Sequence, residues 1–181
     1  MTTALAITVP EADPLTADLR RLHDPSAAAG MPAHLTLLYP FRRSGRIEPA
    51  TLETLQALFA ALPAFDLAFR RVDRFPGVLW LAPEPRAPVD ALTHALAEAF
   101  PDCPPYGGKF AEPVPHLTVA MGEDSTLGPV EQEMTRRLAR PVTARVTRAS
   151  LFAFDRGWRE IARFPLGAAA ADPLDAPAPP P

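Results

Sequence analysis

In this chain of 181 residues, segments with an apolar residue at every second position alternate with segments in which apolar residues recur every three or four positions. Short segments rich in β-branched and aromatic residues alternate apolar with polar side chains, which is typical of half-buried strands. One of these segments is expected to end where Pro83 and Pro85 interrupt it, because proline is unfavourable inside a strand. The pattern predicts strands over residues 3–9, 32–41, 65–72, 78–82, 113–122, 142–154 and 158–164.

Between these strands, apolar residues recur every three or four positions behind an early proline or polar residue, which predicts four amphipathic helices. The first covers residues 14–23, begins at the cap Asp13, and places Leu15, Leu19 and Leu22 on its buried face. The other three helices are expected to bury Leu52, Leu55, Phe59 and Leu62; Val89, Leu92, Leu96 and Ala99; and Val130, Met134 and Leu138.

The order of these elements occurs twice, which indicates an internal duplication. Each half reads strand, helix, loop, strand, helix, strand, and the middle strand of each half holds a histidine two positions before a threonine. These are His34 and Thr36 in PAHLTLLYPF, and His116 and Thr118 in PVPHLTVAMG. Core packing favours valine or isoleucine at such strand positions, so two matching histidines indicate chemistry.

Residues two apart in a strand point to the same face, so His34 projects with Thr36, and His116 with Thr118. If the halves pack about a pseudo-twofold axis, these four side chains line one pocket. Imidazoles serve as base and acid near neutral pH, and hydroxyls stabilise charge on phosphoryl oxygens, so this set suits displacement at phosphorus. That chemistry needs no cofactor, and the histidines and the cysteine of the chain are not spaced as metal ligands.

Paired H-x-T strands in a duplicated α+β chain of this length resemble the two-histidine (2H) phosphoesterase superfamily, and HLTLLYPF is similar to its 2′-5′ RNA ligase-like branch. The resemblance covers residues 4–166. It implies a duplicated, bilobal α+β fold in which two antiparallel sheets surround a central cleft, with helices on the outside. It further implies that His34 and His116 are catalytic, that Thr36 and Thr118 bind phosphate, and that the reaction is a metal-independent attack on 2′,3′-cyclic phosphates or 2′-5′ linkages.

Other residues are weaker candidates for substrate contacts. Tyr106, Lys109 and Phe110 lie in a long loop before the second motif, where the aromatic rings either stack on a base or pack back onto the protein. Arg159 lies near a turn from which it could reach a phosphate, although solvated turn charges are the commoner outcome. Tyr39 alternates away from His34, so we expect it to support its strand from behind.

Length and composition indicate the domain organisation, the cellular compartment and the kind of partner. The length suits a single domain of two lobes over residues 1–167, followed by a disordered tail rich in alanine and proline over 168–181. A net charge of −3 argues against a broad basic surface, so contact with RNA ends or small nucleotide cyclic phosphates should be local. The single cysteine, Cys103, excludes an internal disulfide, and no signal peptide or membrane span is evident. We therefore expect a cytoplasmic monomer without a membrane partner.

The sequence leaves several activities open. Hydrolysis of the phosphodiester is the main prediction, and RNA ligation is the same chemistry in reverse. A non-catalytic nucleotide-binding or RNA-binding module would keep the pocket without turnover, and a structural repeat without a site would leave the two histidines buried or far apart. The symmetry of the motifs does not assign acid and base roles to His34 and His116.

Overall fold

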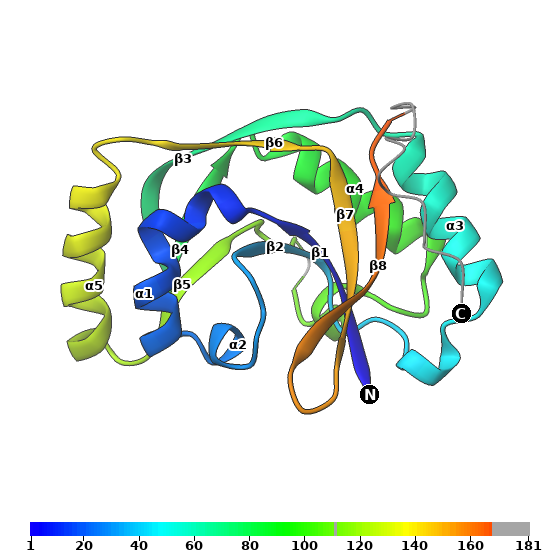
Figure 1. Cartoon of the computed structure of the whole chain (residues 1–181), viewed down its shortest axis with the longest axis horizontal. Coiled ribbons are helices and arrows are strands. Elements are labelled where there is room, and N and C mark those ends of the chain that lie inside the picture. The colour runs from blue at the N-terminus through cyan, green and yellow to red at the C-terminus, as the bar shows by residue number, and fades with distance from the viewer. Residues whose placement is uncertain (111, 168–181) are drawn as a thin grey trace, which may run out of the picture.

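The computed structural model of the chain describes residues 1–110 and 112–167. Its strands form two antiparallel four-stranded sheets, with the orders β2-β1-β7-β8 and β5-β4-β3-β6 (Figure 1), which confirms the predicted α+β class. The predicted tail at 168–181 lies outside the described residues. The strands are β1 Thr2–Thr8, β2 His34–Leu38, β3 Phe65–Phe75, β4 Val78–Glu84, β5 Leu117–Met121, β6 Val142–Val146, β7 Arg148–Phe154 and β8 Trp158–Pro165; the α-helices are α1 Asp13–His23, α2 Pro25–Ala28, α3 Pro49–Ala60, α4 Ala87–Ala99 and α5 Asp124–Arg137; and the short 3-10 helices are η1 Pro10–Ala12, η2 Ser44–Arg46 and η3 Pro105–Gly108.

The two halves of the sequence exchange strands between the sheets. β3 closes the first half in sequence, yet it pairs with β4 and β6 of the second sheet. Residues 142–154, predicted as one strand, form two: β6 pairs with β3, and β7 pairs with β1 of the first sheet. The prediction of one strand was wrong because apolar residues continue through both segments, although two consecutive polar residues, Thr147 and Arg148, shift the alternation where the chain changes sheet.

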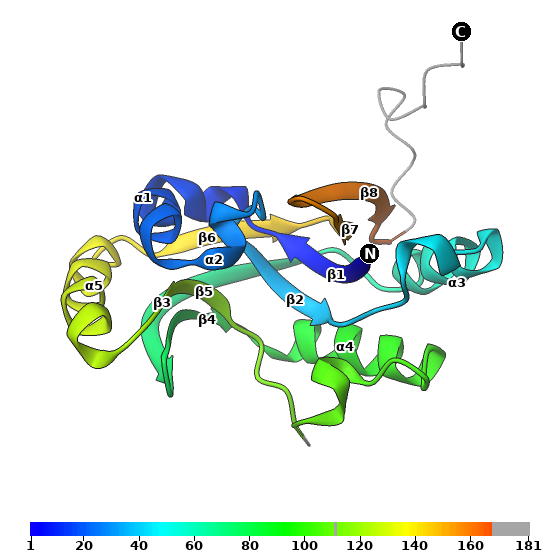
Figure 2. The same cartoon turned by 90° about the horizontal axis from the view of Figure 1, so that it is seen from below.

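The helices cross between the halves as well. α1 packs on β5 and α4 packs on β2, so the first helix of each half covers the histidine strand of the other. In Figure 2, α1 and α5 lie at one end of the molecule, while α3 and α4 lie at the other. One apolar core runs through both sheets and includes fully buried leucines from both histidine strands, Leu35 and Leu117. In the described residues, no helix is both long and apolar enough to span a bilayer.

Local details differ from the predictions in α1 and β4. Asp13 lies inside α1 and Ala12 is its N-cap, without a side-chain cap bond. The fully buried residues of α1 are Thr16 and Arg20; the predicted Leu15 and Leu19 are partly buried against the core, and Leu22 is 71% exposed. Arg20 can be buried because its polar atoms find partners, which hydrophobic periodicity does not register.

Pro83 was predicted to end the strand at 78–82, but it lies within β4 and pairs with Phe69. The pairing of β4 with β5 extends only from Val78 to Leu81. Beyond Leu81 that side of β4 is therefore an unpaired edge, where a strand tolerates proline.

Candidate active site

The two histidine strands are brought together at the junction of the sheets. β2 is the terminal strand of the first sheet and β5 is the terminal strand of the second. They contact each other without being neighbours in a hydrogen-bonded ladder. His34 begins β2 and His116 directly precedes β5, so the duplicated motif places one imidazole on each side of this junction.

A cavity of about 270 Å³ opens between the two strands. Three of the predicted site residues line it, namely His34, Thr36 and Thr118, whereas His116, the second predicted catalytic histidine, is not among its lining residues. The remaining lining residues are Ala4, Asp24, Ser26, Met31, Tyr39, Met121 and Trp158. The lining therefore combines polar side chains with apolar and aromatic ones, a combination suited to a phosphate attached to a nucleoside. Among the described residues, no group of three or more histidine, cysteine or carboxylate side chains is placed to hold a metal ion.

Both histidines use the same backbone contact to fix the orientation of the ring. Nδ1 of His34 lies 2.8 Å from the carbonyl oxygen of Pro32, and Nδ1 of His116 lies 2.8 Å from that of Val114. A carbonyl only accepts hydrogen bonds, so the proton of each neutral ring must be on Nδ1. Nε2 of each ring consequently carries a free lone pair, as a general base requires.

The surroundings of both rings favour the neutral form. The pKa of His34 is lowered to about 4, mainly by burial. The positive charges of Arg20 and His116 also lower it, whereas the hydrogen bond to the Pro32 carbonyl and the negative charge of Asp24 raise it. Burial also lowers the pKa of His116, opposed by the Val114 carbonyl.

Tyr106, one of the predicted substrate contacts, lies between the two motifs. Its ring stacks on His116 with a centroid separation of 6.4 Å, and its hydroxyl forms a hydrogen bond with Thr36. Its backbone N–H donates to the carbonyl oxygen of Tyr39 over 2.6 Å. Burial raises the pKa of Tyr106 to about 12, opposed by the Thr36 contact, so the phenol remains protonated at neutral pH.

The other predicted substrate contacts, Phe110, Lys109 and Arg159, do not line the cavity. Phe110 is 58% exposed and packs edge-on against Tyr106, with the ring centroids 5.7 Å apart. Lys109 is exposed in the same loop. Arg159 is exposed on β8 next to the cavity-lining residue Trp158, but it does not itself line the cavity.

Two aromatic residues of the cavity wall were missed or misplaced by sequence reasoning. Tyr39 was predicted to lie behind its strand, but it lines the cavity and packs edge-on against Trp158 at 6.1 Å. That prediction was wrong because β2 ends at Leu38, so the alternation of faces no longer applies at Tyr39. Trp158 is held over the cavity by its backbone N–H, which donates to the carbonyl oxygen of Ala29 over 2.7 Å.

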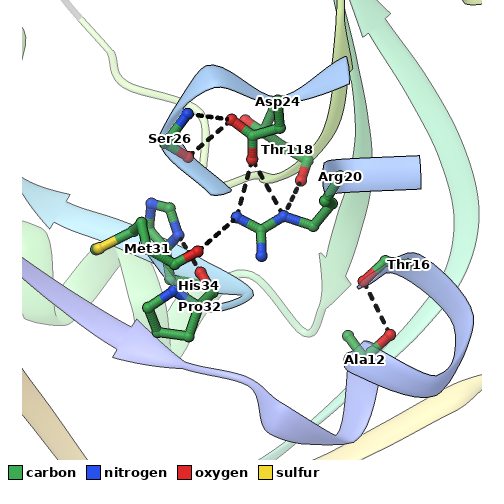
Figure 3. A network of polar contacts seen from close by, with 9 residues as sticks. All are labelled: Ala12, Thr16, Arg20, Asp24, Ser26, Met31, Pro32, His34 and Thr118. Atoms are coloured by element: carbon green, nitrogen blue, oxygen red, sulfur yellow. Dashed lines mark hydrogen bonds and ion pairs between the residues drawn. The ribbon is translucent and has the colours of Figure 1, made fainter. Parts of the chain in front are cut away.

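A buried ion pair, also missed from the sequence, joins the two sides of the site (Figure 3). Nε of Arg20 donates to the Asp24 carboxylate and to the carbonyl oxygen of Thr118, both over 3.1 Å. Its Nη2 donates to Asp24 over 2.8 Å and to the carbonyl oxygen of Met31 over 3.3 Å. The other Asp24 oxygen accepts hydrogen bonds from the backbone and hydroxyl of Ser26. Arg20 therefore connects β5 to the segment that leads into β2.

Comparison with known proteins identifies the family. A family model described as the 2′-5′ RNA ligase superfamily matches residues 8–158, a region that contains both motifs. The chain belongs to this superfamily. Its members are 2H phosphoesterases and RNA ligase-like proteins, as the sequence resemblance implied. No curated protein sequence matches the chain.

Solved structures of this superfamily type share the fold. Escherichia coli LigT in its apo form is 21% identical, with a TM-score of 0.58 over 92% of this chain and 97% of that one. LigT complexed with 3′-AMP is also 21% identical, with a TM-score of 0.56 over 91% and 97% of the two chains. The protein TT0787 of Thermus thermophilus is 16% identical, with a TM-score of 0.56 over 93% and 100%.

Replacing Asp24 by asparagine should destabilise the protein by about 3–5 kcal/mol, because it leaves the buried Arg20 guanidinium without its counter-charge. Urea denaturation of the wild-type and variant proteins measures this free energy. The matched control is Asp66→Asn, which removes the exposed carboxylate paired with Arg145 and should cost less than about 1 kcal/mol. Equal losses in the two variants would contradict the structural role assigned to the Arg20–Asp24 pair.

Proposed function

We propose that this superfamily member is a metal-independent phosphodiesterase that hydrolyses 2′,3′-cyclic phosphates or 2′-5′ linkages, with His34 and His116 as the acid and base. One observation carries the proposal: both rings hold Nδ1 against a backbone carbonyl, and Nε2 of neither ring is hydrogen-bonded to another described residue, on two strands that contact each other. A buried histidine with a purely structural role has no need of a matching partner in this geometry. Two such rings supply a proton acceptor and a proton donor for one displacement.

The electrostatics favour His34 as the base. The positive charges of Arg20 and His116 both oppose protonation of His34, whereas the pKa of His116 is lowered by burial alone. On a cyclic phosphate, His34 would take a proton from the attacking water as the new bond to phosphorus forms. His116, protonated in the presence of the anionic substrate, would give its proton to the departing ribose oxygen as the bond from phosphorus to that oxygen breaks.

The threonines are placed to bind the phosphoryl oxygens. Thr36 and Thr118 line the cavity from its two sides, and a hydroxyl from each can donate to a non-bridging oxygen. The hydrogen bond between the Tyr106 and Thr36 hydroxyls restricts the orientations of the Thr36 side chain. Tyr106 would thus be a positioning residue for phosphate binding.

The shape of the cavity supports a nucleotide substrate. Trp158, Tyr39 and Met31 line the cavity together with the two threonines, so a base can lie against the apolar residues while its phosphate meets the hydroxyls. A crystal structure of LigT contains 3′-AMP, and a 3′-nucleotide is the product of opening a 2′,3′-cyclic phosphate at its 2′ oxygen. Ligation is the alternative suggested by the description of the family, and it would use the same groups in reverse.

Replacing either His34 or His116 by alanine should reduce kcat on a nucleoside 2′,3′-cyclic phosphate by about 10²–10⁴, the usual contribution of a general acid or base. Turnover by the wild-type protein should continue in EDTA, and His94→Ala should leave kcat unchanged because His94 is exposed on α4. Chromatography of the products distinguishes hydrolysis from ligation. Full turnover by either alanine variant would refute the assignment, and binding without turnover by the wild-type protein would indicate a non-catalytic module.

The dependence of kcat/KM on pH should be bell-shaped and centred on the acidic side of neutrality. The neutral base is lost as the pH falls through the His34 pKa of about 4, and the protonated acid is lost as the pH rises through a His116 pKa below the ordinary value of 6.5. Asp24→Asn should move the acidic limb to lower pH, because Asp24 raises the His34 pKa. An acidic limb at the ordinary histidine value would contradict this assignment.

A further inference from the structure

A second hollow, of about 670 Å³, lies beside the segments that build the cavity. It is lined by Arg42, Arg43, Arg46, Glu48, Asp102 and Cys103. The arginines on one side of this arginine hollow follow the cavity residue Tyr39 in the chain. Arg42 is three residues after Tyr39, so at most about 11 Å of extended chain separates them. The other side leads directly into Tyr106, whose backbone N–H is bonded to the carbonyl oxygen of Tyr39. The hollow and the cavity are therefore connected through Tyr39, which lines the cavity and is bonded to the segment that follows Cys103.

The three arginines of the hollow differ in how they are held. Nη1 of Arg42 donates to Thr51 over 2.9 Å, its Nη2 pairs with Asp102 over 3.3 Å, and its guanidinium lies 5.2 Å from the centre of the Phe100 ring. This side chain is thus part of the framework, and Asp102 is already paired. The charge of the hollow available to a ligand comes from the other two arginines.

Arg43 and Arg46 are exposed, and within the part of the chain that the structure describes neither forms a side-chain hydrogen bond or an ion pair. Many other arginines are engaged; Arg71, Arg74 and Arg137, for example, each pair with two carboxylates. Two free guanidinium groups beside one carboxylate, Glu48, give the hollow a positive balance in a chain whose net charge is −3. Guanidinium groups bind phosphate oxygens in bidentate geometry.

We propose that the arginine hollow binds the phosphodiester backbone of a single-stranded RNA whose 3′ end occupies the cavity, with Arg43 and Arg46 as the phosphate contacts. The inference rests on the proposed function and refines it, because it selects an RNA end over a free mononucleotide as the substrate. A mononucleotide fills only the cavity of about 270 Å³, whereas a strand that continues from the terminal nucleotide needs a second anion site next to it. A locally basic site also lets an acidic protein hold a polyanion without a broad basic surface.

The test compares a nucleoside 2′,3′-cyclic phosphate with a tetranucleotide that ends in the same cyclic phosphate. The double variant Arg43→Ala/Arg46→Ala should raise KM about tenfold for the tetranucleotide and leave kcat unchanged, while both constants for the mononucleotide stay at wild-type values. In fluorescence anisotropy, the dependence of log affinity for a labelled tetranucleotide 3′-phosphate on log salt concentration should become shallower by about 1.4, as expected for two lost single-strand phosphate contacts.

The control is Arg21→Ala/Arg140→Ala, which makes the same change in net charge with two exposed arginines on α1 and just after α5. α5 lies at the opposite end of the molecule from α3, which follows the arginine hollow in the chain (Figure 1). The proposal is overturned if the two double variants behave alike, or if the Arg43/Arg46 variant affects both substrates equally. If the wild-type protein turns over neither substrate, the proposed function fails, and the anisotropy comparison alone then decides whether the hollow binds RNA.

Discussion

The site depends on a junction between two strands that no β-ladder joins. β2 and β5 are terminal strands of separate sheets, so backbone pairing does not set their spacing. Polar contacts at both ends of the junction connect them instead. At one end, Arg20 donates to carbonyl oxygens on both sides; at the other, the Tyr106 backbone bonds to Tyr39 and its phenol to Thr36. Because Arg20 is buried, its charge needs Asp24, which makes the ion pair a requirement of the geometry.

The crossed arrangement of the chain explains why this junction can exist. Each half contributes its first helix to the other half's histidine strand, and β7 carries the chain from the second sheet back to the first. A duplicated sequence folded as two independent lobes would leave each H-x-T motif in its own lobe. The exchange brings the motifs together over one continuous core, with Leu35 and Leu117 buried behind the two polar pairs.

The strand residues that line the cavity could be predicted from the sequence because strand periodicity is local. His34 and Thr36 share a face by their spacing alone, and the second copy doubles that signal. Arg20 and Tyr39 could not be placed in the same way. Arg20 is buried by partners on three separate segments, and Tyr39 lies just beyond the end of its strand, where alternation no longer determines direction. The division of residues 142–154 into two strands did leave a signal in the sequence, because Thr147 and Arg148 are both polar and shift the alternation by one position.

The proposed mechanism needs two neutral imidazoles, on the strands that meet beside the cavity, with Nε2 of each available to the substrate. Long-range ¹H–¹⁵N NMR of the histidine side chains tests this directly, since it reports the protonation of each ring nitrogen. At neutral pH, His34 and His116 should both be neutral with the proton on Nδ1, and addition of a 3′-nucleotide should protonate Nε2 of His116 while His34 stays neutral. A proton on Nε2 of either free ring, or no response of either ring to the nucleotide, would contradict it.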